Sequence, residues 1–246
     1  MEKEVLEYFL NLPLSSTDAV FEKFESITNA RIYVGEQPKQ KVLYIEGDRN
    51  DRILIVAHAD TVWDEVYVNE QIQQYTYADE EEIYYGSLLQ AGIGADDRAG
   101  CAIAWLMRES GHSILITDGE ERGEIGATYL KEQEIDVYER INQHQYILQV
   151  DLRGKNGYKC YDLPVSNAFT DYIEQHTNLR NAGKEKRTDI CVLCNQICGV
   201  NISVGYKREH SVLETLDYEA WLCAYQRVKA LAELSKIPKF SLFEKM

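Results

Sequence analysis

Positive charge and long apolar segments are both scarce in this sequence. The 246 residues contain 26 Lys and Arg against 41 Asp and Glu, which gives a formal net charge of −15 at pH 7. We therefore expect no nucleic-acid partner, because phosphate backbones are bound mainly by basic side chains. No segment reaches the ~18 consecutive apolar residues of a membrane-spanning helix, so we expect no membrane partner either.

Signals for secretion and for a disulfide scaffold are also lacking. The N-terminal stretch MEKEVLEYFLNLPL carries acidic residues and too short an apolar run for a signal peptide, and we expect a cytoplasmic location. Six cysteines in 246 residues are too few for a disulfide-stapled fold. There is no internal repeat, low-complexity tract or long linker, which favours a single domain over residues 1–246.

The chain does contain a regular alternation of short apolar strands and amphipathic helices. Strands are expected near residues 30–34, 41–46, 53–56, 113–117, 146–150, 190–193 and 200–204, with less readable ones at 66–68 and 83–85. Helices are expected near residues 3–11, 17–27, 98–111, 127–130, 167–176 and 217–234. This alternation predicts an α/β fold, with a mostly parallel (mixed) central sheet and helices on both faces.

Two short patterns suggest a metal site. His58 and Asp60 follow the apolar strand 53–56, and a carboxylate at this spacing can fix the second nitrogen of a ligating imidazole. Asp96 and Asp97 form an adjacent pair in a glycine-flanked turn before a helix. Taken alone, each pattern favours an ordinary structural interpretation: a core or loop histidine, and an aspartate that caps a helix.

The larger set of candidate ligands changes this balance. Four expected strands lead into His58, Glu120 and Glu121, Asp151 and His210, and Asp96 comes from the turn before a helix. The carboxyl ends of strands in an open α/β sheet can converge on one edge. Two imidazoles and three carboxylates suit two divalent cations such as zinc, cobalt or manganese. A spare carboxylate beside them could act as a base.

Five motifs occur in a specific order and spacing between about residues 52 and 235. They are HADT at 58–61, GADDRAG at 94–100, DGEERGEIGA at 118–127, VDLRG at 150–154 and NISVGYKREHSVLE at 201–214, with RTD at 187–189 as a further match. These motifs resemble those of the co-catalytic zinc exopeptidases. That superfamily comprises zinc aminopeptidases, peptidase T-like tripeptidases and metal-dependent N-acyl amino acid deacylases.

The resemblance implies a set of ligands for two metal ions, most simply zinc, with cobalt or manganese as alternatives. His58 and Asp151 would bind one ion, and Glu121 and His210 would bind the other. Asp96 would bridge the two ions, with the peptide bond after it in the cis form.

The resemblance also implies the roles of the residues around these ligands. Asp60 would orient His58, and Glu120 would be the general base. Glu214 would support His210. Asp97 is the weaker candidate for the bridge, because the first aspartate of the pair matches the motif.

One departure from many relatives concerns the segment between the fourth and fifth ligands. Only 59 positions separate Asp151 and His210, which leaves no room for the lid or dimerisation domain found there in many relatives. The chain thus resembles the compact single-domain aminopeptidases. We expect an aminopeptidase acting on short peptides or small amides. An N-acyl amino acid amidohydrolase is the alternative, and a non-catalytic metal-binding protein on the same scaffold is less favoured.

A few residues outside the motifs have competing interpretations. Cys191, Cys194 and Cys198 could form a metal or iron–sulfur site, but as flanks of a buried strand they are better explained as small apolar residues. Tyr206 is a candidate substrate contact. His112, His144 and His176 are expected to be structural or surface groups. Side-chain specificity, oligomeric state and the metal used in the cell stay open.

Overall fold

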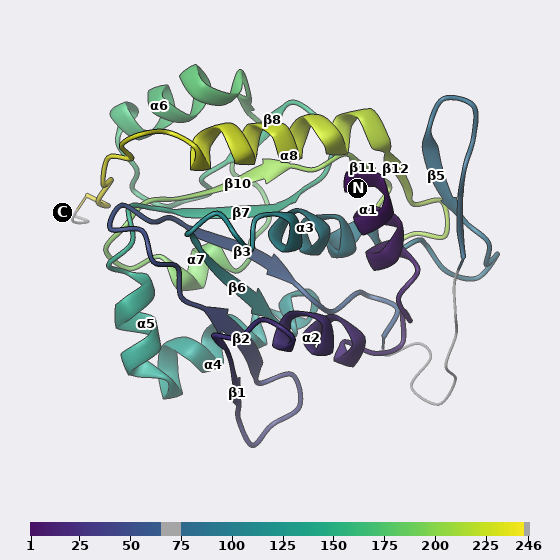
Figure 1. The fold of residues 1–246 in the computed structure, drawn as a ribbon, viewed down its shortest axis with the longest axis horizontal. Helices are drawn as coiled ribbons and strands as arrows, with labels where there is room; N and C mark the ends of the chain where they lie inside the picture. The colour runs from purple at the N-terminus through teal and green to yellow at the C-terminus, as the bar shows by residue number, and fades with distance from the viewer. Residues whose placement is uncertain (65–74, 244–246) are drawn as a thin grey trace.

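An eight-stranded mixed sheet organises the structure, a computed structural model that describes residues 1–64 and 75–243 (Figure 1). Its strands in spatial order are β1 (Ala30–Val34), β2 (Lys41–Ile45), β6 (Ser113–Thr117), β3 (Leu54–His58), β7 (Ile147–Leu152), β10 (Gly199–Ser203), β8 (Gly157–Lys159) and β9 (Arg180–Asn181). The four central strands β6, β3, β7 and β10 are parallel, whereas β1, β2 and β8 pair antiparallel with inner neighbours. The predicted α/β class is confirmed.

Helices cover both faces of this sheet, as the sequence predicts. One face is covered by α1 (Glu2–Leu10), α2 (Asp18–Glu25), α3 (Ala95–Leu106), α6 (Asn167–Thr177) and α8 (Tyr218–Ala232); the other is covered by α4 (Ile125–Gln133), α5 (Ile135–Ile141) and α7 (Ile190–Leu193). Strand β3 shows why both faces need a cover. Ile55 and Ala57 belong to the first core, while Leu54 and Val56 belong to the second. A strand with two apolar faces is stable only between two layers.

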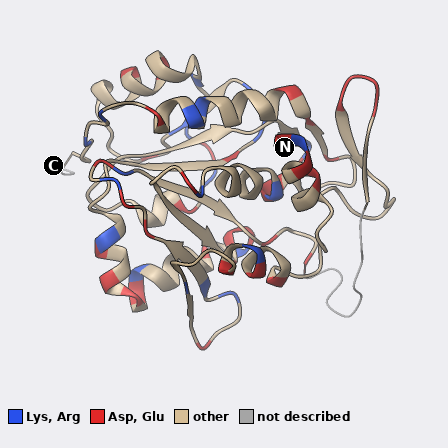
Figure 2. Cartoon of the chain, in the orientation of Figure 1, with Lys and Arg blue, Asp and Glu red and all other residues tan. Residues whose placement is uncertain are grey.

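A smaller antiparallel sheet lies beside the main one, at the right of Figure 1. It consists of β11 (Tyr206–Lys207), β12 (Thr215–Asp217), β5 (Ile83–Gly86) and β4 (Thr76–Ala78). The acidic run DEEE at 79–82 joins β4 to β5, and its carboxylates colour the tip of this hairpin in Figure 2. The strand expected near 83–85 is confirmed as β5, and the one expected at 66–68 lies outside the described residues.

The segment 190–193 is a helix, although its Ile-Cys-Val-Leu sequence predicts a strand. The backbone N–H groups of Val192 and Leu193 donate to the carbonyl oxygen of Asp189 at 2.9 and 2.8 Å, and the N–H of Ile190 donates to Gln149 Oε1 at 3.1 Å. This single turn buries Ile190 and Leu193 against α4 and the second core. Tertiary burial therefore overrides the strand preference of β-branched residues.

No inserted domain separates Asp151 from His210. Within this segment β8, β9 and β10 join the main sheet, and α6 and α7 pack on its two faces. The expected absence of a lid domain is thus confirmed.

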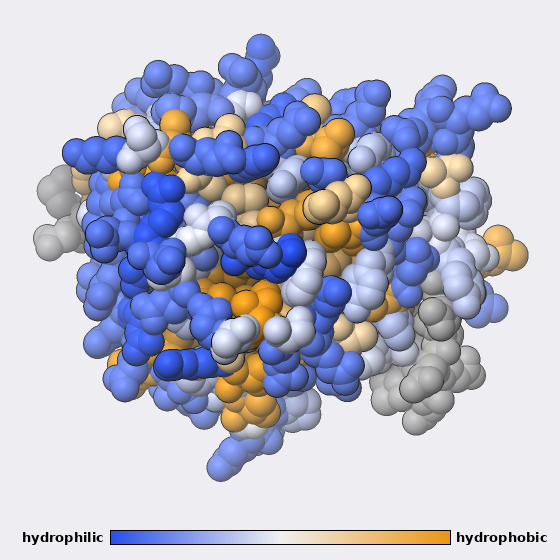
Figure 3. Space-filling view, in the orientation of Figure 1, coloured by the Kyte–Doolittle hydropathy of each residue, from blue (hydrophilic) through white to orange (hydrophobic). Residues whose placement is uncertain are grey.

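One face of the molecule is mainly polar. Hydrophilic residues cover most of the face shown in Figure 3, and the hydrophobic residues visible there lie mainly in the centre of the view. In the part of the chain that the structure describes, no helix combines the length and apolar character needed to cross a bilayer.

Candidate metal centre

The candidate ligands meet at the carboxyl edge of the central strands. His58 is the last residue of β3, Asp151 lies near the end of β7, and Glu120 and Glu121 open the 3₁₀ helix η1 (Glu120–Arg122) after β6. The parallel register of β6, β3 and β7 brings these three strand ends to one edge. Asp96 comes from the first turn of α3, and His210 from the loop after β11. The structure therefore brings together all five predicted ligands and Glu120.

Asp96 lies between the two histidines. Its Oδ1 is 3.1 Å from His58 Nε2, and its Oδ2 is 3.1 Å from His210 Nε2. The peptide bond between Asp96 and Asp97 is cis, as expected. One carboxylate that presents one oxygen to each imidazole has the geometry required of a bridging ligand.

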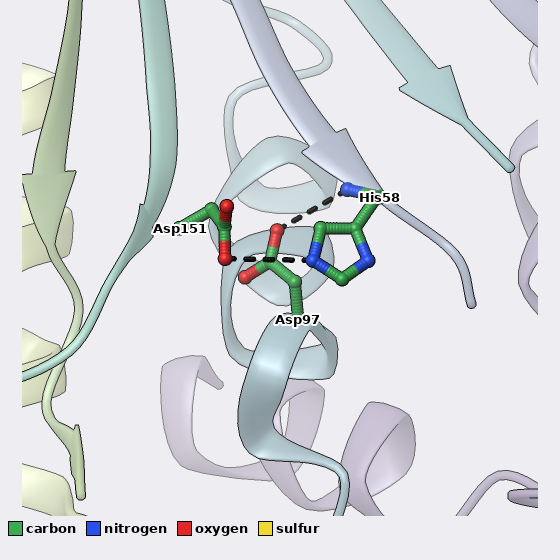
Figure 4. Close-up of side chains that lie close together, drawn as sticks. All are labelled: His58, Asp97 and Asp151. Atoms are coloured by element: carbon green, nitrogen blue, oxygen red, sulfur yellow. Dashed lines mark hydrogen bonds and ion pairs between the residues drawn. The ribbon is translucent and has the colours of Figure 1, made fainter. Parts of the chain in front are cut away.

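Asp97, the next residue of the same turn, points towards His58 and Asp151 (Figure 4). It lies close enough to His58 and Asp151 to share an ion with them. However, its Oδ2 accepts the backbone N–H of His58 at 3.2 Å and its Oδ1 accepts that of Gly100 at 2.9 Å. Because both oxygens are used by backbone donors, Asp97 fastens the turn to β3, and Asp96 is the better candidate for the bridge.

His58 and Asp151 form the more buried half of the centre. Asp151 Oδ1 lies 3.4 Å from His58 Nε2 and accepts the hydroxyl of Tyr206 at 3.1 Å. Its Oδ2 accepts the Nε2 of Gln149 at 3.1 Å and the hydroxyl of Thr188 at 3.0 Å. Tyr206, expected to contact substrate, thus donates its hydroxyl to a candidate ligand. Such partners fix the orientation of ligating carboxylates.

Glu121 and His210 form the more open half. Glu121 Oε1 lies 3.0 Å from His210 Nε2, and the side chain of His210 is 43% exposed. Asp96, Glu121 and His210 each offer one ligand atom, and these atoms lie close together. This set of nitrogen and oxygen donors fits a divalent metal ion.

Asp60 connects the two halves. His58 Nδ1 lies 3.1 Å from the backbone oxygen of Asp60 and 3.4 Å from its Oδ1. The carboxylate of Asp60 also accepts the backbone N–H groups of Glu120 and Glu121, each at 3.2 Å. The geometry agrees with the expected role of orienting His58 and adds a second one, the anchoring of η1.

Glu120 lies beside the centre without occupying it. Its Oε2 is 4.0 Å from His58 Nε2, and its side chain is 12% exposed. Burial raises the pKa of Glu120 well above its usual range, and the nearby charge of Asp151 adds to the rise. A carboxyl group with a raised pKa beside candidate ligands can both take up and return a proton.

The centre as a whole favours bound positive charge. Burial lowers the pKa of His58, but the charge of Asp151 and hydrogen bonds to neighbouring carboxylates outweigh this effect and raise the pKa well above normal. Hydrogen bonds with Asp96 and Glu121 raise the pKa of His210 to about 10. The same imidazoles and carboxylates that hold these protons could hold divalent cations.

Glu214 supports the turn of Asp96 instead of His210, which corrects the sequence-based expectation. Its Oε2 accepts the N–H of Gly94 at 2.8 Å, and its Oε1 accepts the N–H of Asp96 at 3.0 Å. Burial raises the pKa of Glu214 to about 8. The sequence holds no signal for these contacts, because they join residues about 120 positions apart.

Two other clusters do not resemble metal sites. Asp60, Asp64 and Asp118 lie close together, but Lys39 forms ion pairs with Asp64 and Asp118 and supplies the counter-charge. The groups that could hold a metal in residues 1–64 and 75–243 contain no cysteine. This favours the apolar interpretation of the three cysteines at 191, 194 and 198.

A cleft of about 890 Å³ opens onto the centre. Asp96, Glu120, Glu121, Asp151 and His210 line its inner end. Its outer walls come from residues 152–161, 180–188 and the loop before His210. The cleft thus gives a short extended ligand access to the predicted base and ligands.

Comparison with known proteins identifies the fold. No protein-family model matches the chain, and no curated protein matches it in sequence. Among solved structures, aminopeptidase PepT from Bacillus cereus aligns with a TM-score of 0.67 and 14% identity over 94% of this chain and 97% of that one. A TET aminopeptidase from a Thaumarchaeota archaeon aligns with a TM-score of 0.67 and 12% identity over 96% and 98%. The chain has the fold of these aminopeptidases.

A tripeptidase from Staphylococcus aureus leads to the same conclusion. It aligns with a TM-score of 0.64 and 11% identity over 93% of this chain and 96% of that one. The resemblance to the exopeptidase superfamily, inferred from the motifs, is confirmed at the level of the fold. At these identities the likeness concerns the fold alone, so the function must be argued from the site.

Proposed function

We propose that the protein is a two-metal exopeptidase, an aminopeptidase that removes N-terminal residues from short peptides, with residues 1–246 as one catalytic domain. The observation that carries this proposal is the position of Asp96, with one carboxylate oxygen 3.1 Å from His58 and the other 3.1 Å from His210. The raised pKa of Glu120 beside this bridge and the peptidase fold support it.

In this proposal His58 and Asp151 would hold one ion, Glu121 and His210 would hold the second, and Asp96 would offer one carboxylate oxygen to each side. Zinc suits this mixture of nitrogen and oxygen donors, as do cobalt and manganese. When bound there, such ions would supply a water molecule with its pKa lowered towards ~7 and a positive charge to polarise the carbonyl group.

The residues of the chain supply positioning and proton transfer. Glu120 takes the proton of the attacking water, stores it as a buried carboxylic acid, and passes it to the departing amine. Asp60 keeps this base in place by accepting the backbone N–H of Glu120, and it fixes the tautomer of His58. In an aminopeptidase, the free amine of the substrate contacts the centre or nearby carboxylates, which explains a requirement for an unblocked N-terminus.

Metal content and substrate panels test the proposal together. Protein purified without chelator should contain about two divalent ions per chain by elemental analysis. It should hydrolyse aminoacyl amides and leave N-acetyl amino acids intact. Cleavage of only the acylated panel would instead support the N-acyl amino acid amidohydrolase. A chain that binds no metal even when zinc or cobalt is supplied would refute the two-metal mechanism.

Glu120→Gln separates catalysis from metal binding. The variant should lose about 10²–10⁴-fold in kcat, because glutamine cannot accept the proton of the water. Its metal content should stay that of the wild type. Glu132→Gln, on the exposed side of α4, is the matched control and should keep full activity. If Glu120→Gln retains normal kcat, another group is the base; if the metal-replete wild type is inert towards both panels, a non-catalytic metal-binding role is favoured.

A further inference from the structure

The outer walls of the cleft have a charge opposite to that of the chain. Beyond the metal centre they contain six basic residues, Arg153, Lys155, Lys159, Arg180, Lys186 and Arg187, and three acidic ones, Glu124, Glu185 and Glu209. The whole chain has 26 basic and 41 acidic residues. The entrance to the candidate centre therefore has an excess of basic residues, whereas the chain as a whole has an excess of acidic ones.

The acidic residues in and beside the walls neutralise only part of this charge. Arg153 and Lys186 both lie 3.3 Å from the same oxygen of Glu209, so two cations share one carboxylate. Three looser pairs, each at 3.5 Å, join Arg187 to Glu124, Lys159 to Glu185 and Lys155 to Asp217. Within the described part of the chain, the exposed side chain of Arg180 has no ion-pair partner.

These basic side chains come from segments that fix their positions. Arg180 lies in β9, which is hydrogen bonded to β8 along the cleft, and its backbone N–H donates to Asn156 at 2.9 Å. Glu209 is nearly buried and directly precedes His210, so the pair with Arg153 and Lys186 ties the wall to the metal centre. A cleft whose walls carry an excess of one charge concentrates ligands of the opposite charge. Guanidinium groups are well suited to bind carboxylates through two parallel hydrogen bonds.

We propose that this basic wall binds a carboxylate of the substrate, so that the protein prefers short peptides carrying a free carboxylate close to the scissile bond; this inference rests on the function proposed above. The carboxylate has two sources in a short peptide, namely the C-terminus and the side chain of Asp or Glu. Both present the same planar anion to the guanidinium groups of the wall.

Matched peptide pairs distinguish these sources. Ala-Ala-Ala and its C-terminal amide differ only in the terminal carboxylate, whereas Ala-Glu-Ala amide and Ala-Gln-Ala amide differ only in the side chain. We expect kcat/KM to be about tenfold higher, or more, for the charged member of at least one pair. The pair that responds identifies the source, and the preference should shrink as salt is added.

Substitution of Arg180 tests the assignment to the wall. Arg180→Gln should raise KM for the charged member of the responding pair without lowering its kcat, so that its kcat/KM falls towards that of the uncharged member, while Arg180→Lys should keep most of the preference. Lys131→Gln, exposed on α4, is the control for loss of one positive charge elsewhere. Arg153 and Lys186 are less suitable targets, because their partner Glu209 adjoins His210.

Failure of this inference is distinguishable from failure of the proposed function. Equal kcat/KM within both pairs, with hydrolysis of both, overturns the carboxylate preference and leaves the aminopeptidase intact. If the zinc-loaded protein hydrolyses none of the four peptides, the proposed function fails. Calorimetric Kd values for the same pairs then test separately whether the basic wall binds a carboxylate. A tighter Kd for the charged member that is lost in Arg180→Gln supports the wall, whereas equal or no binding overturns it.

Discussion

The two adjacent aspartates of the α3 turn have such different partners that substituting one or the other should have different effects. Asp96 contacts only side chains of the centre through its oxygens, whereas both oxygens of Asp97 are used by backbone N–H groups. Asp96 thus serves the candidate metal centre, whereas Asp97 stabilises the fold.

We expect Asp96→Asn to lose metal and Asp97→Asn to lose stability. Without the bridging charge of Asp96, metal affinity should fall by more than the ~10–100-fold typical of outer-shell changes. Asp97→Asn leaves a buried N–H poorly partnered and should lower the free energy of unfolding of the metal-free protein by about 1–3 kcal/mol. Metal titration and denaturant unfolding of both variants provide the measurements. The same loss of metal affinity in both would contradict the assignment of the bridge.

Sequence predicts residues of the site well where a strand ends, and poorly where a hydrogen bond depends on packing. His58 and Asp151 can be identified because an apolar run leads into each. The support that Thr188 gives to Asp151 joins residues 37 positions apart, and no local pattern encodes it. Tyr206 is visible as an aromatic residue near His210, but only the structure shows that its hydroxyl donates to Asp151.

At the scale of elements, the turn that begins α3 depends on a carboxylate from the segment before β12. Glu214 accepts two N–H groups of this turn, and a Cβ on Gly92 would lie 2.5 Å from its Oε2. The close approach explains why glycine stands at position 92. The loop of His210 and the turn of Asp96 are thereby joined.

Glu214→Gln should therefore weaken metal binding without touching a metal ligand. An amide offers one oxygen where the turn needs two acceptors, so the N–H of either Gly94 or Asp96 loses its partner. We expect metal affinity to fall by about 10–100-fold, as for other outer-shell substitutions. Competition with a chelator of known affinity measures it. Unchanged affinity would mean that the turn holds its shape without Glu214.

Element types could be predicted except where burial outweighs propensity. The strands of the main sheet follow from runs of β-branched residues, and the long helix α8 from its apolar spacing. The segment 190–193 has equally strand-like residues, yet it forms α7 because one helical turn covers the second core. The kink at the start of α3 is likewise set by partners distant in sequence.

At the scale of the whole molecule, the pH and the bound metal should together determine the stability of the fold. In the metal-free fold, hydrogen bonds with Asp96 and Glu121 raise the pKa of His210 from 6.5 to about 10. Its proton therefore stabilises the fold fully below pH 6.5, and this contribution is lost as the pH rises towards 10. Burial of Glu214, whose pKa is raised to about 8, acts in the same direction.

We expect the Tm of the chelator-treated protein to fall by a few degrees between pH 6.5 and 10. Saturating zinc should reduce this dependence, because a bound ion replaces the proton on His210. Differential scanning calorimetry across the range provides the measurement, and His210→Gln should flatten the profile of the metal-free protein. A Tm that rises with pH in the presence of chelator would contradict the linkage.

The cytoplasmic location and the single-domain organisation stay predictions.

The order in which the ligands occur along the chain has a consequence for synthesis. The centre draws on β3, the α3 turn, η1, β7 and finally the loop of His210, so it is completed only after most of the chain has left the ribosome. A nascent molecule holds the base and four of the five candidate ligands, yet lacks the partner of Glu121. The proposed hydrolase would thus be made in an inert form and would become active towards surrounding peptides only as its own fold closes.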